Sequence, residues 1–283
     1  MSALRLSYYP SIAQTLTADQ LDASIRAFAT VLSGKLGAPV EVQPPLLVPD
    51  QIQSIREGRT DIALMNPLGY ALAHRATPSV QAVTVALREP TEGPPGAAPV
   101  PTYRAQIYTN ANSGITSLAQ LRHRTFAFGS AHSTSSFLVP ARHLQNARLP
   151  ATCSFKTLAF LGGHQDVAKA VYAGSVDAGA GHDGVISDLA KTPGYSDAAH
   201  RLVRLAWTDT IKSDPIAVNL PAATRDAVQK ALIEAGADAA GVTQLGIFWQ
   251  EVKGLARVGA DDYDFVVDDM RELGLKYDEE VLG

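Results

Sequence analysis

Four hydroxyl side chains stand in a row at residues 133–136, within the stretch FGSAHSTSSFLVP. The apolar run before them predicts a strand, and the residues after them have helical spacing. Ligands bind at the carboxyl ends of strands in α/β sheets, and the free N–H groups of a helix start favour an anion. Ser133, Thr134 and Ser135 therefore predict a nest for a tetrahedral oxyanion. The alternative is that one serine caps the helix and the others face solvent. Because Pro140 lacks an N–H, we expect the helix to be short or to restart there.

Two glycine-rich segments follow the serine turn. In FLGGHQDVAKAV, His164 precedes an amphipathic pattern and is placed either to donate a hydrogen bond to a ligand or to cap the helix. A bound anion beside it would favour the charged imidazolium. The stretch GAGHDG (179–184) spells G-x-G-x-x-G, but Pro193 and Gly194 stop the next helix early. We therefore expect His182 and Asp183 to line a cleft, and we do not expect them to hold a dinucleotide or zinc.

Several function classes are disfavoured by the sequence. It has no G-x-S-x-G, H-E-x-x-H or Walker motif, so we expect no catalytic residues, no metal and no cofactor. A net charge of -4 without a basic run argues against nucleic acid as a partner. No apolar run is long enough to span a membrane, and the N-terminus lacks the apolar core of a secretory signal. A small ligand or a protein partner is expected instead.

Strand-like and helical patterns alternate along the chain, which predicts an α/β fold with a largely parallel sheet. Residues 17–37 predict a helix with Thr17 as N-cap and glycine after its end. A second helix is expected to be capped by Asp50, and a third to begin at Asn66. The proline-rich segment 87–103 predicts a long loop near a lobe boundary. The similar stretches IREGRTDIALMN and VYAGSVDAGAGH suggest two lobes built alike.

Five segments, in order, resemble the substrate-binding proteins of phosphonate and phosphite ABC transporters. They are LRLSYYP, GRTDIALMNPLGYALA, YRAQIYTNANSGITSLAQLRHRTFAFGSAHSTSSFLVP, FLGGHQDVAKAVYAGSVDAGA and IKSDPIAVNLP. The resemblance implies a type 2 periplasmic-binding-protein architecture with a ligand cleft between two lobes. Each lobe would be a mostly parallel sheet flanked by helices. Residues 1–103 plus 213–283 would form lobe 1, and residues 104–212 would form lobe 2.

The resemblance also implies roles for individual residues. The turn Ser133, Thr134 and Ser135 would grip the phosphorus oxyanion, and His164 would contact it. Tyr103 matches a tyrosine where the chain crosses between lobes, and Asp214 an aspartate at the return crossing. Two positions depart from the family pattern: Ser136 stands in place of a glycine, and Gln51 in place of a tyrosine. We expect specificity for the substituent on phosphorus to come from the opposite lobe, with Tyr9, Gln51, Asn66 and His182 as candidates.

The expected function is non-catalytic binding of a small phosphorus oxyanion, such as a phosphonate, phosphite or phosphate-like ion, for an ABC-type uptake system. The partner would be an ABC permease. The location would be periplasmic by resemblance, and the missing signal peptide leaves a cytoplasmic one open. The alternatives are a ligand-sensing module of a signalling system and, less favoured, a nucleotide-dependent oxidoreductase.

Overall fold

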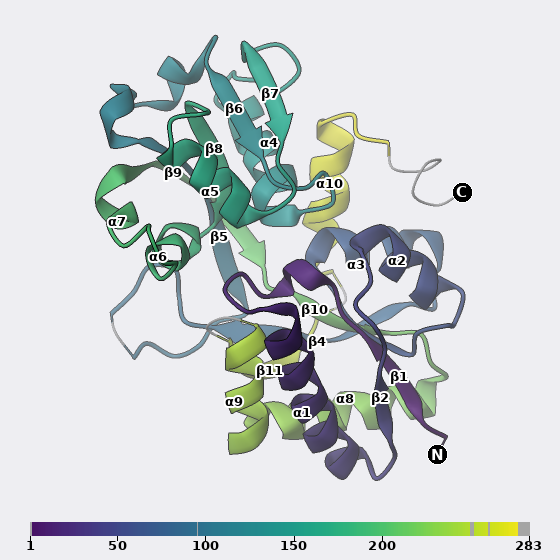
Figure 1. Cartoon of the computed structure of the whole chain (residues 1–283). Coiled ribbons are helices and arrows are strands. Elements are labelled where there is room, and N and C mark those ends of the chain that lie inside the picture. The colour runs from purple at the N-terminus through teal and green to yellow at the C-terminus, as the bar shows by residue number, and fades with distance from the viewer. Residues whose placement is uncertain (1, 95, 250–251, 260, 277–283) are drawn as a thin grey trace. The chain divides into compact units, whose positions relative to one another are not determined.

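Two sheets organise the molecule, one in each of two α/β units (Figure 1). The computed structural model describes residues 2–94, 96–249, 252–259 and 261–276. Within them, unit 1 comprises the residues up to 102, then 212–265 and 276, and unit 2 comprises 103–211 and 266–275. The sequence assigned all of 213–283 to lobe 1, whereas residues 266–275 group with unit 2.

The six-stranded sheet of unit 1 is mixed. Its strand order is β11 (Val252–Arg257), β4 (Gln81–Arg88), β10 (Pro215–Val218), β3 (Ile62–Leu64), β1 (Leu4–Ser7) and β2 (Val40–Val42). Strand β1 pairs in parallel with β2 and β3, but β10 is antiparallel to both of its neighbours, and β11 is antiparallel to β4. The expectation of a mostly parallel sheet is therefore wrong for this unit. The physical reason is that β10 enters the sheet at the carboxyl end of β3, after the chain returns from unit 2.

Helices of unit 1 confirm most of the sequence signals. Helix α1 (Ala18–Leu36) begins with a capping box at Thr17 and ends at Gly37, whose φ of 69° suits glycine. Asn66 caps α3 (Pro67–Ala76) by accepting the Gly69 N–H. The prediction that Asp50 caps the second helix is wrong, because α2 (Val48–Arg56) starts two residues earlier with proline in its first turn.

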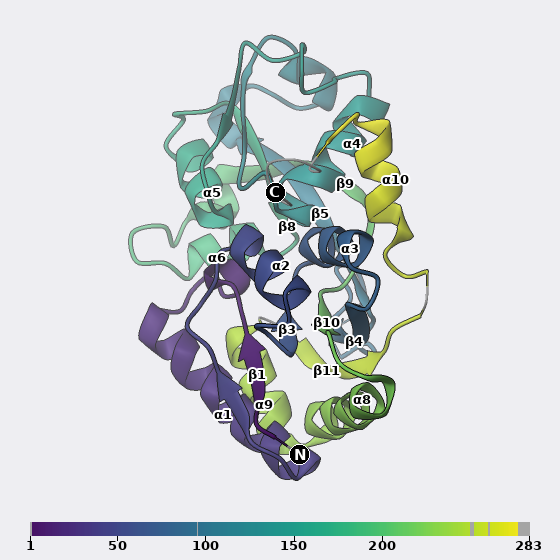
Figure 2. The same ribbon diagram turned by 90° about the vertical axis from the view of Figure 1, so that its right-hand side faces the viewer.

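The core of unit 1 joins its sheet to three helices. Helices α1, α8 (Ala222–Ala237) and α9 (Ala239–Phe248) pack on one another, and their apolar side chains share one cluster with β1, β3, β4 and β10. Helices α2 and α3 lie side by side next to β3 and β10 (Figure 2). This packing fixes the sheet whose carboxyl edge carries the polar residues described below.

The five-stranded sheet of unit 2 has helices on both faces. Its order is β7 (Thr157–Phe160), β6 (Thr125–Phe128), β8 (Ala178–His182), β5 (Thr102–Asn110) and β9 (Leu202–Lys212). Alternate side chains of β6 enter two separate cores: Phe126 and Phe128 pack in the cluster of α4 (Val139–Asn146), while Ala127 packs in that of α5 (His164–Tyr172) and α6 (Val185–Ala190).

Helix α10 (Asp264–Glu272) packs on α4 within unit 2 (Figure 1). Arg142 of α4 pairs with Asp269 at 3.7 Å and with Glu272, and Gln145 Nε2 donates to the Glu272 carbonyl at 3.0 Å. Leu273 and Leu275 reach the same apolar cluster as α4. These contacts explain why the segment after residue 265 leaves unit 1. In the described part of the chain, no helix has the length and apolar character needed to cross a bilayer.

Candidate functional site

Three loops of unit 2 meet at one edge of its sheet. Strands β7, β6 and β8 are parallel neighbours, so their carboxyl ends lie together. The loop after β6 carries the serine turn, the loop after β7 leads to His164, and β8 ends at His182. Strand β5 runs antiparallel to β8 with Ala105 opposite His182, which places Tyr103 at the same edge. The structure thus brings together six of the ten predicted ligand residues: Ser133, Thr134, Ser135, Tyr103, His164 and His182.

The serine turn begins a helix with an unusual first turn. Ser133 is its N-cap, and its Oγ accepts the Ser136 N–H at 3.1 Å. Residues Thr134–Leu138 form a π-helical turn, η4, that runs directly into α4. Pro140 has no N–H for the carbonyl four residues earlier, so the backbone uses wider bonds such as Leu138 N to Ser133 O. The regular α-helix begins at Val139 with Pro140 in its first turn, which agrees with the expected restart there. One of the four hydroxyls, that of Ser133, is a cap.

At these helix starts, some buried polar atoms have no hydrogen-bond partner within the described ranges of the chain. The Ser136 side chain is 1% exposed, and its Oγ has no hydrogen-bond partner among the described residues. It lies against Gly129, where an added Cβ would be only 2.4 Å from that oxygen. Both amide atoms of Gln165, on the first turn of α5, are likewise buried and unpartnered within the described chain. Such groups are costly unless a ligand or water satisfies them. No local sequence signal singles out Gln165, since a glutamine in a first helical turn is ordinarily solvated.

His164 is held as a neutral hydrogen-bond donor. Its Nδ1 accepts the backbone N–H of His182 at 3.2 Å, so the proton of the neutral ring is on Nε2. Burial lowers the pKa of His164 well below its usual value, the nearby ring of His182 lowers it further, and Asp183 opposes the shift. The two rings meet edge to face at 4.7 Å. A neutral Nε2–H group can donate to an oxyanion without bringing a charge to the site.

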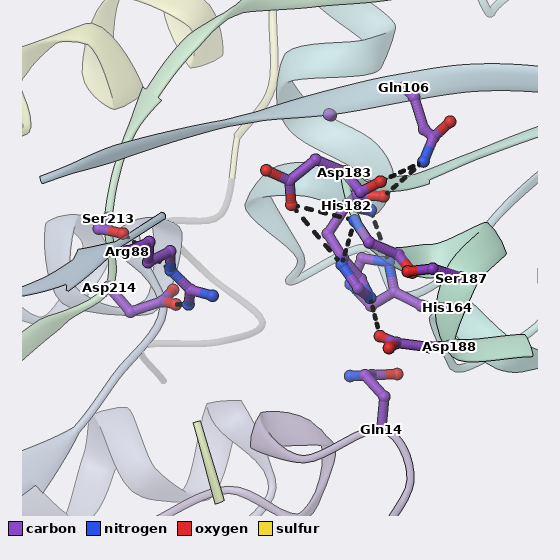
Figure 3. Close-up of polar contacts among 12 residues, drawn as sticks. Gln14, Arg88, Gln106, His164, His182, Asp183, Ser187, Asp188, Ser213 and Asp214 are labelled. Carbon is purple, nitrogen blue, oxygen red and sulfur yellow. Dashed lines mark hydrogen bonds and ion pairs between the residues drawn. The ribbon is translucent and has the colours of Figure 1, made fainter. Parts of the chain in front are cut away.

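His182 belongs to the same unit as the serine turn, so its assignment to the opposite lobe is wrong. The reason is that β8 is the direct neighbour of β6. His182 Nδ1 accepts the Gly184 N–H at 3.1 Å, and His182 Nε2 lies 3.6 Å from the buried Asp188 carboxylate (Figure 3). Gln106 Nε2 donates to the carbonyls of His182 and Asp183, at 3.2 and 2.6 Å. In unit 2, the His182 ring therefore packs against His164 and holds the segment after β8 through the Gly184 N–H.

The carboxyl edge of the unit 1 sheet carries a second polar group. Tyr9 follows β1, Asn66 follows β3, and Asp214 precedes the antiparallel β10, so all three lie at this edge. Gln51 reaches it from α2 but is fully buried, donating to Ser7 Oγ at 3.2 Å and to a backbone carbonyl at 3.0 Å. Its Oε1 is buried without a partner among the described residues. The four remaining predicted residues, Tyr9, Gln51, Asn66 and Asp214, are thus neighbours of one sheet edge.

Asp214 is bound by an arginine that the sequence analysis did not single out. Arg88, the last residue of β4, donates from Nη2 to Asp214 Oδ2 at 2.5 Å and from Nε to Ser213 Oγ at 2.9 Å (Figure 3). The side chains are 15% and 8% exposed. Arg88 stands directly before the proline-rich loop. Its position at the end of a strand was the one sequence signal that could have marked it as a site residue.

The G-x-G-x-x-G stretch is packing, not a phosphate loop. Gly179 and Gly181 lie inside β8, where added Cβ atoms would be 2.3 Å from Val167 Cγ1 and 3.0 Å from Val185 Cγ1. These glycines let α5 and α6 approach the strand closely. Since α6 has only six residues, it is a poor seat for a pyrophosphate. The described residues also include no group of three His, Cys, Asp or Glu side chains arranged to hold a metal.

Known proteins match this chain over nearly its whole length. A family model described as "ABC transporter, phosphonate, periplasmic substrate-binding protein" matches residues 11–263. PhnD1 from Prochlorococcus marinus, solved with methylphosphonate, has a TM-score of 0.78 at 19% identity over 96% of this chain and 98% of that one. A binding protein component of an ABC phosphonate transporter from Pseudomonas aeruginosa has a TM-score of 0.77 at 18% identity, over 96% of this chain and 87% of that one. A Xanthomonas citri protein bound to ATP has a TM-score of 0.76 at 16% identity, over 97% of this chain and 98% of that one. The predicted binding-protein fold is confirmed.

Proposed function

Because the chain belongs to the family of periplasmic substrate-binding proteins of phosphonate ABC transporters, we propose that it holds a small phosphorus oxyanion at the carboxyl edge of the unit 2 sheet. The ligand would be a phosphonate, a phosphite or a phosphate-like ion. The protein would work in the periplasm and deliver the ligand to an ABC permease, without a chemical step. The solved PhnD1 contains methylphosphonate, which supports this ligand class.

The observation that carries the proposal is the convergence of charge-neutral donors. Hydroxyls of the serine turn, the N–H groups at the start of η4 and the Nε2–H of His164 gather where β6, β7 and β8 end. A helix start favours an anion through its free N–H groups and its dipole. Hydrogen bonds to an ionised acceptor are about twice as strong as neutral ones, so neutral donors suffice.

The individual contacts to the ligand remain proposals. We assign the oxyanion to Ser133, Thr134, Ser135 and His164, with Tyr103 at the same edge. The hydroxyl of Ser136, which is buried and has no partner in the described part of the chain, supports an occupant at this turn. Tyr9, Gln51, Asn66 and Asp214 stay candidates for contacts to the substituent, and the interlobe cleft stays a prediction.

Isothermal titration calorimetry with methylphosphonate, phosphite, phosphate, sulfate and ATP tests the proposal. We expect one-to-one binding of a phosphorus oxyanion and weaker binding of sulfate. Ser135→Ala should weaken the binding, whereas Thr17→Ala, which removes the cap hydroxyl of α1 in unit 1, should not. Absence of heat with every phosphorus oxyanion would contradict the proposed function.

A further inference from the structure

An arginine neutralises the carboxylate that stands among the candidate ligand residues of unit 1. Arg88 holds Asp214 at 2.5 Å and Ser213 Oγ at 2.9 Å, and both charged side chains are largely buried. Bonds of this kind fix the direction of a guanidinium, which stays protonated at every physiological pH. The Asp214 carboxylate therefore already has its cation.

The backbone places this pair firmly at the carboxyl edge of the unit 1 sheet. The Ala86 N–H donates to the Asp214 carbonyl at 3.1 Å, and the Met65 N–H to the Pro215 carbonyl at 3.1 Å. The Arg88 N–H donates to the Val100 carbonyl at 2.8 Å. Tyr9 and Asn66 follow strands that end at this same edge. In α/β sheets, this is the edge at which ligands bind.

We propose that Arg88 determines the charge of the substituent that the protein accepts on phosphorus, excluding ligands whose substituent carries an ammonium group. The inference rests on the proposed function. A free buried carboxylate would favour a ligand cation, because each charge would satisfy the other. Here the arginine satisfies Asp214 from within the chain, so the pair carries no net charge and offers an incoming ammonium no anion to offset the loss of its hydration. The ligand class is thus phosphite and phosphonates with an uncharged substituent, such as methylphosphonate.

A second arginine–aspartate pair in unit 1 provides a matched control. Arg5 Nε and Nη2 donate to the Asp61 carboxylate at 2.8 and 2.9 Å, and Arg5 is 42% exposed. Arg5 lies on β1 and Asp61 just before β3, toward the amino ends of these parallel strands. That pair is therefore away from the edge that carries Arg88, and its loss should not alter ligand selectivity.

Calorimetry with methylphosphonate and 2-aminoethylphosphonate tests the inference. We expect the wild-type protein to bind methylphosphonate at least tenfold more tightly. Arg88→Met uncovers Asp214 and should shift the ratio of the two Kd values at least tenfold toward 2-aminoethylphosphonate. Adding Asp214→Asn to that variant should abolish the shift, and Arg5→Met should leave the ratio unchanged.

Arg88→Met leaves the buried Asp214 charge unpaired, which could destabilise the protein, so the experiment has a second arm. That arm uses Asp214→Asn, which keeps a hydrogen-bond acceptor for Arg88. Asp214→Asn leaves the guanidinium unneutralised and should improve binding of phosphonoacetate at least fivefold relative to methylphosphonate. If the Arg88–Asp214 pair has a purely structural role, both variants should have lower melting temperatures and unchanged Kd ratios. That result would overturn the inference. Equal binding of both phosphonates by the wild-type protein would overturn it while leaving the proposed function intact. Absence of binding to either, and to phosphite, would overturn both.

Discussion

Separate alanine substitutions of Ser135 and Ser133 distinguish ligand binding from helix capping at the serine turn. Ser133 Oγ caps η4 by accepting the Ser136 N–H at 3.1 Å. The Ser135 side chain is 6% exposed, and the cap of η4 is the hydroxyl of Ser133, not that of Ser135. Loss of the Ser135 hydroxyl should therefore affect the bound state almost alone, whereas loss of the Ser133 hydroxyl should affect both binding and folding.

The magnitudes follow from these contacts. Ser135→Ala removes one hydrogen bond to a charged acceptor, worth about 1.5–3 kcal/mol, so the Kd for methylphosphonate should rise roughly 10- to 150-fold. The melting temperature of the ligand-free protein should change little. Ser133→Ala should also raise the Kd, and loss of the cap should lower the ligand-free stability by about 1 kcal/mol, or roughly 2–4 °C in melting temperature.

Calorimetry on both variants, with thermal melts of the ligand-free proteins, measures the two effects independently. Thr17→Ala is the control, because it removes the cap hydroxyl of α1 and should lower only the stability. If Ser135→Ala leaves the Kd unchanged, the turn does not hold the ligand. A fall in stability without a change in Kd for both serine variants would refute the reasoning and assign the hydroxyls to the helix.

Three further predictions concern pH and packing. The lowered pKa of His164 means that the unfolded chain binds a proton below about pH 6.5 that the folded protein does not, so stability falls as pH falls below that value. His164→Gln keeps a neutral donor and should reduce this slope in urea melts at pH 5–7. Burial raises the pKa of Asp269 to about 6, so the stability that it contributes is lost as pH rises from about 4 through 6. Asp269→Asn should therefore stabilise the protein at pH 7.5 by about 1 kcal/mol, allowing for solvent screening, and not at pH 4. Gly179→Ala places a methyl 2.3 Å from Val167 Cγ1 and should destabilise the fold by about 1–3 kcal/mol, whereas Gly34→Ala, which meets nothing within 4 Å, should stabilise it by up to about 1 kcal/mol.

Much of the fold follows from local sequence signals. The Thr17 N-cap, the helix end at Gly37 and the helix start at Asn66 each depend on neighbouring residues alone, and all three were predicted correctly. The direction of β10 was not predictable from its own residues, because it depends on where the chain re-enters the sheet. The attachment of α10 to unit 2 likewise depends on Arg142, far away in sequence.

The candidate site was predictable where one turn carries it. The hydroxyl run and His164 each follow a strand, so the parallel order of β6 and β7 was enough to bring them together. The partners of those residues were not predictable. Nothing local indicates that the His182 N–H fixes the tautomer of His164, or that Arg88 binds an aspartate 126 residues later. Such pairings are set by strand register and by packing.

A crystal structure of the protein with methylphosphonate tests the central claim most directly. We expect the phosphonate oxygens within hydrogen-bond distance, about 2.6–3.2 Å, of Ser135 Oγ, His164 Nε2 and the N–H groups at the start of η4. Arg88 should remain bound to Asp214. Methylphosphonate located away from the ends of β6 and β7, or a serine turn that contacts only solvent in crystals saturated with methylphosphonate, would contradict the account.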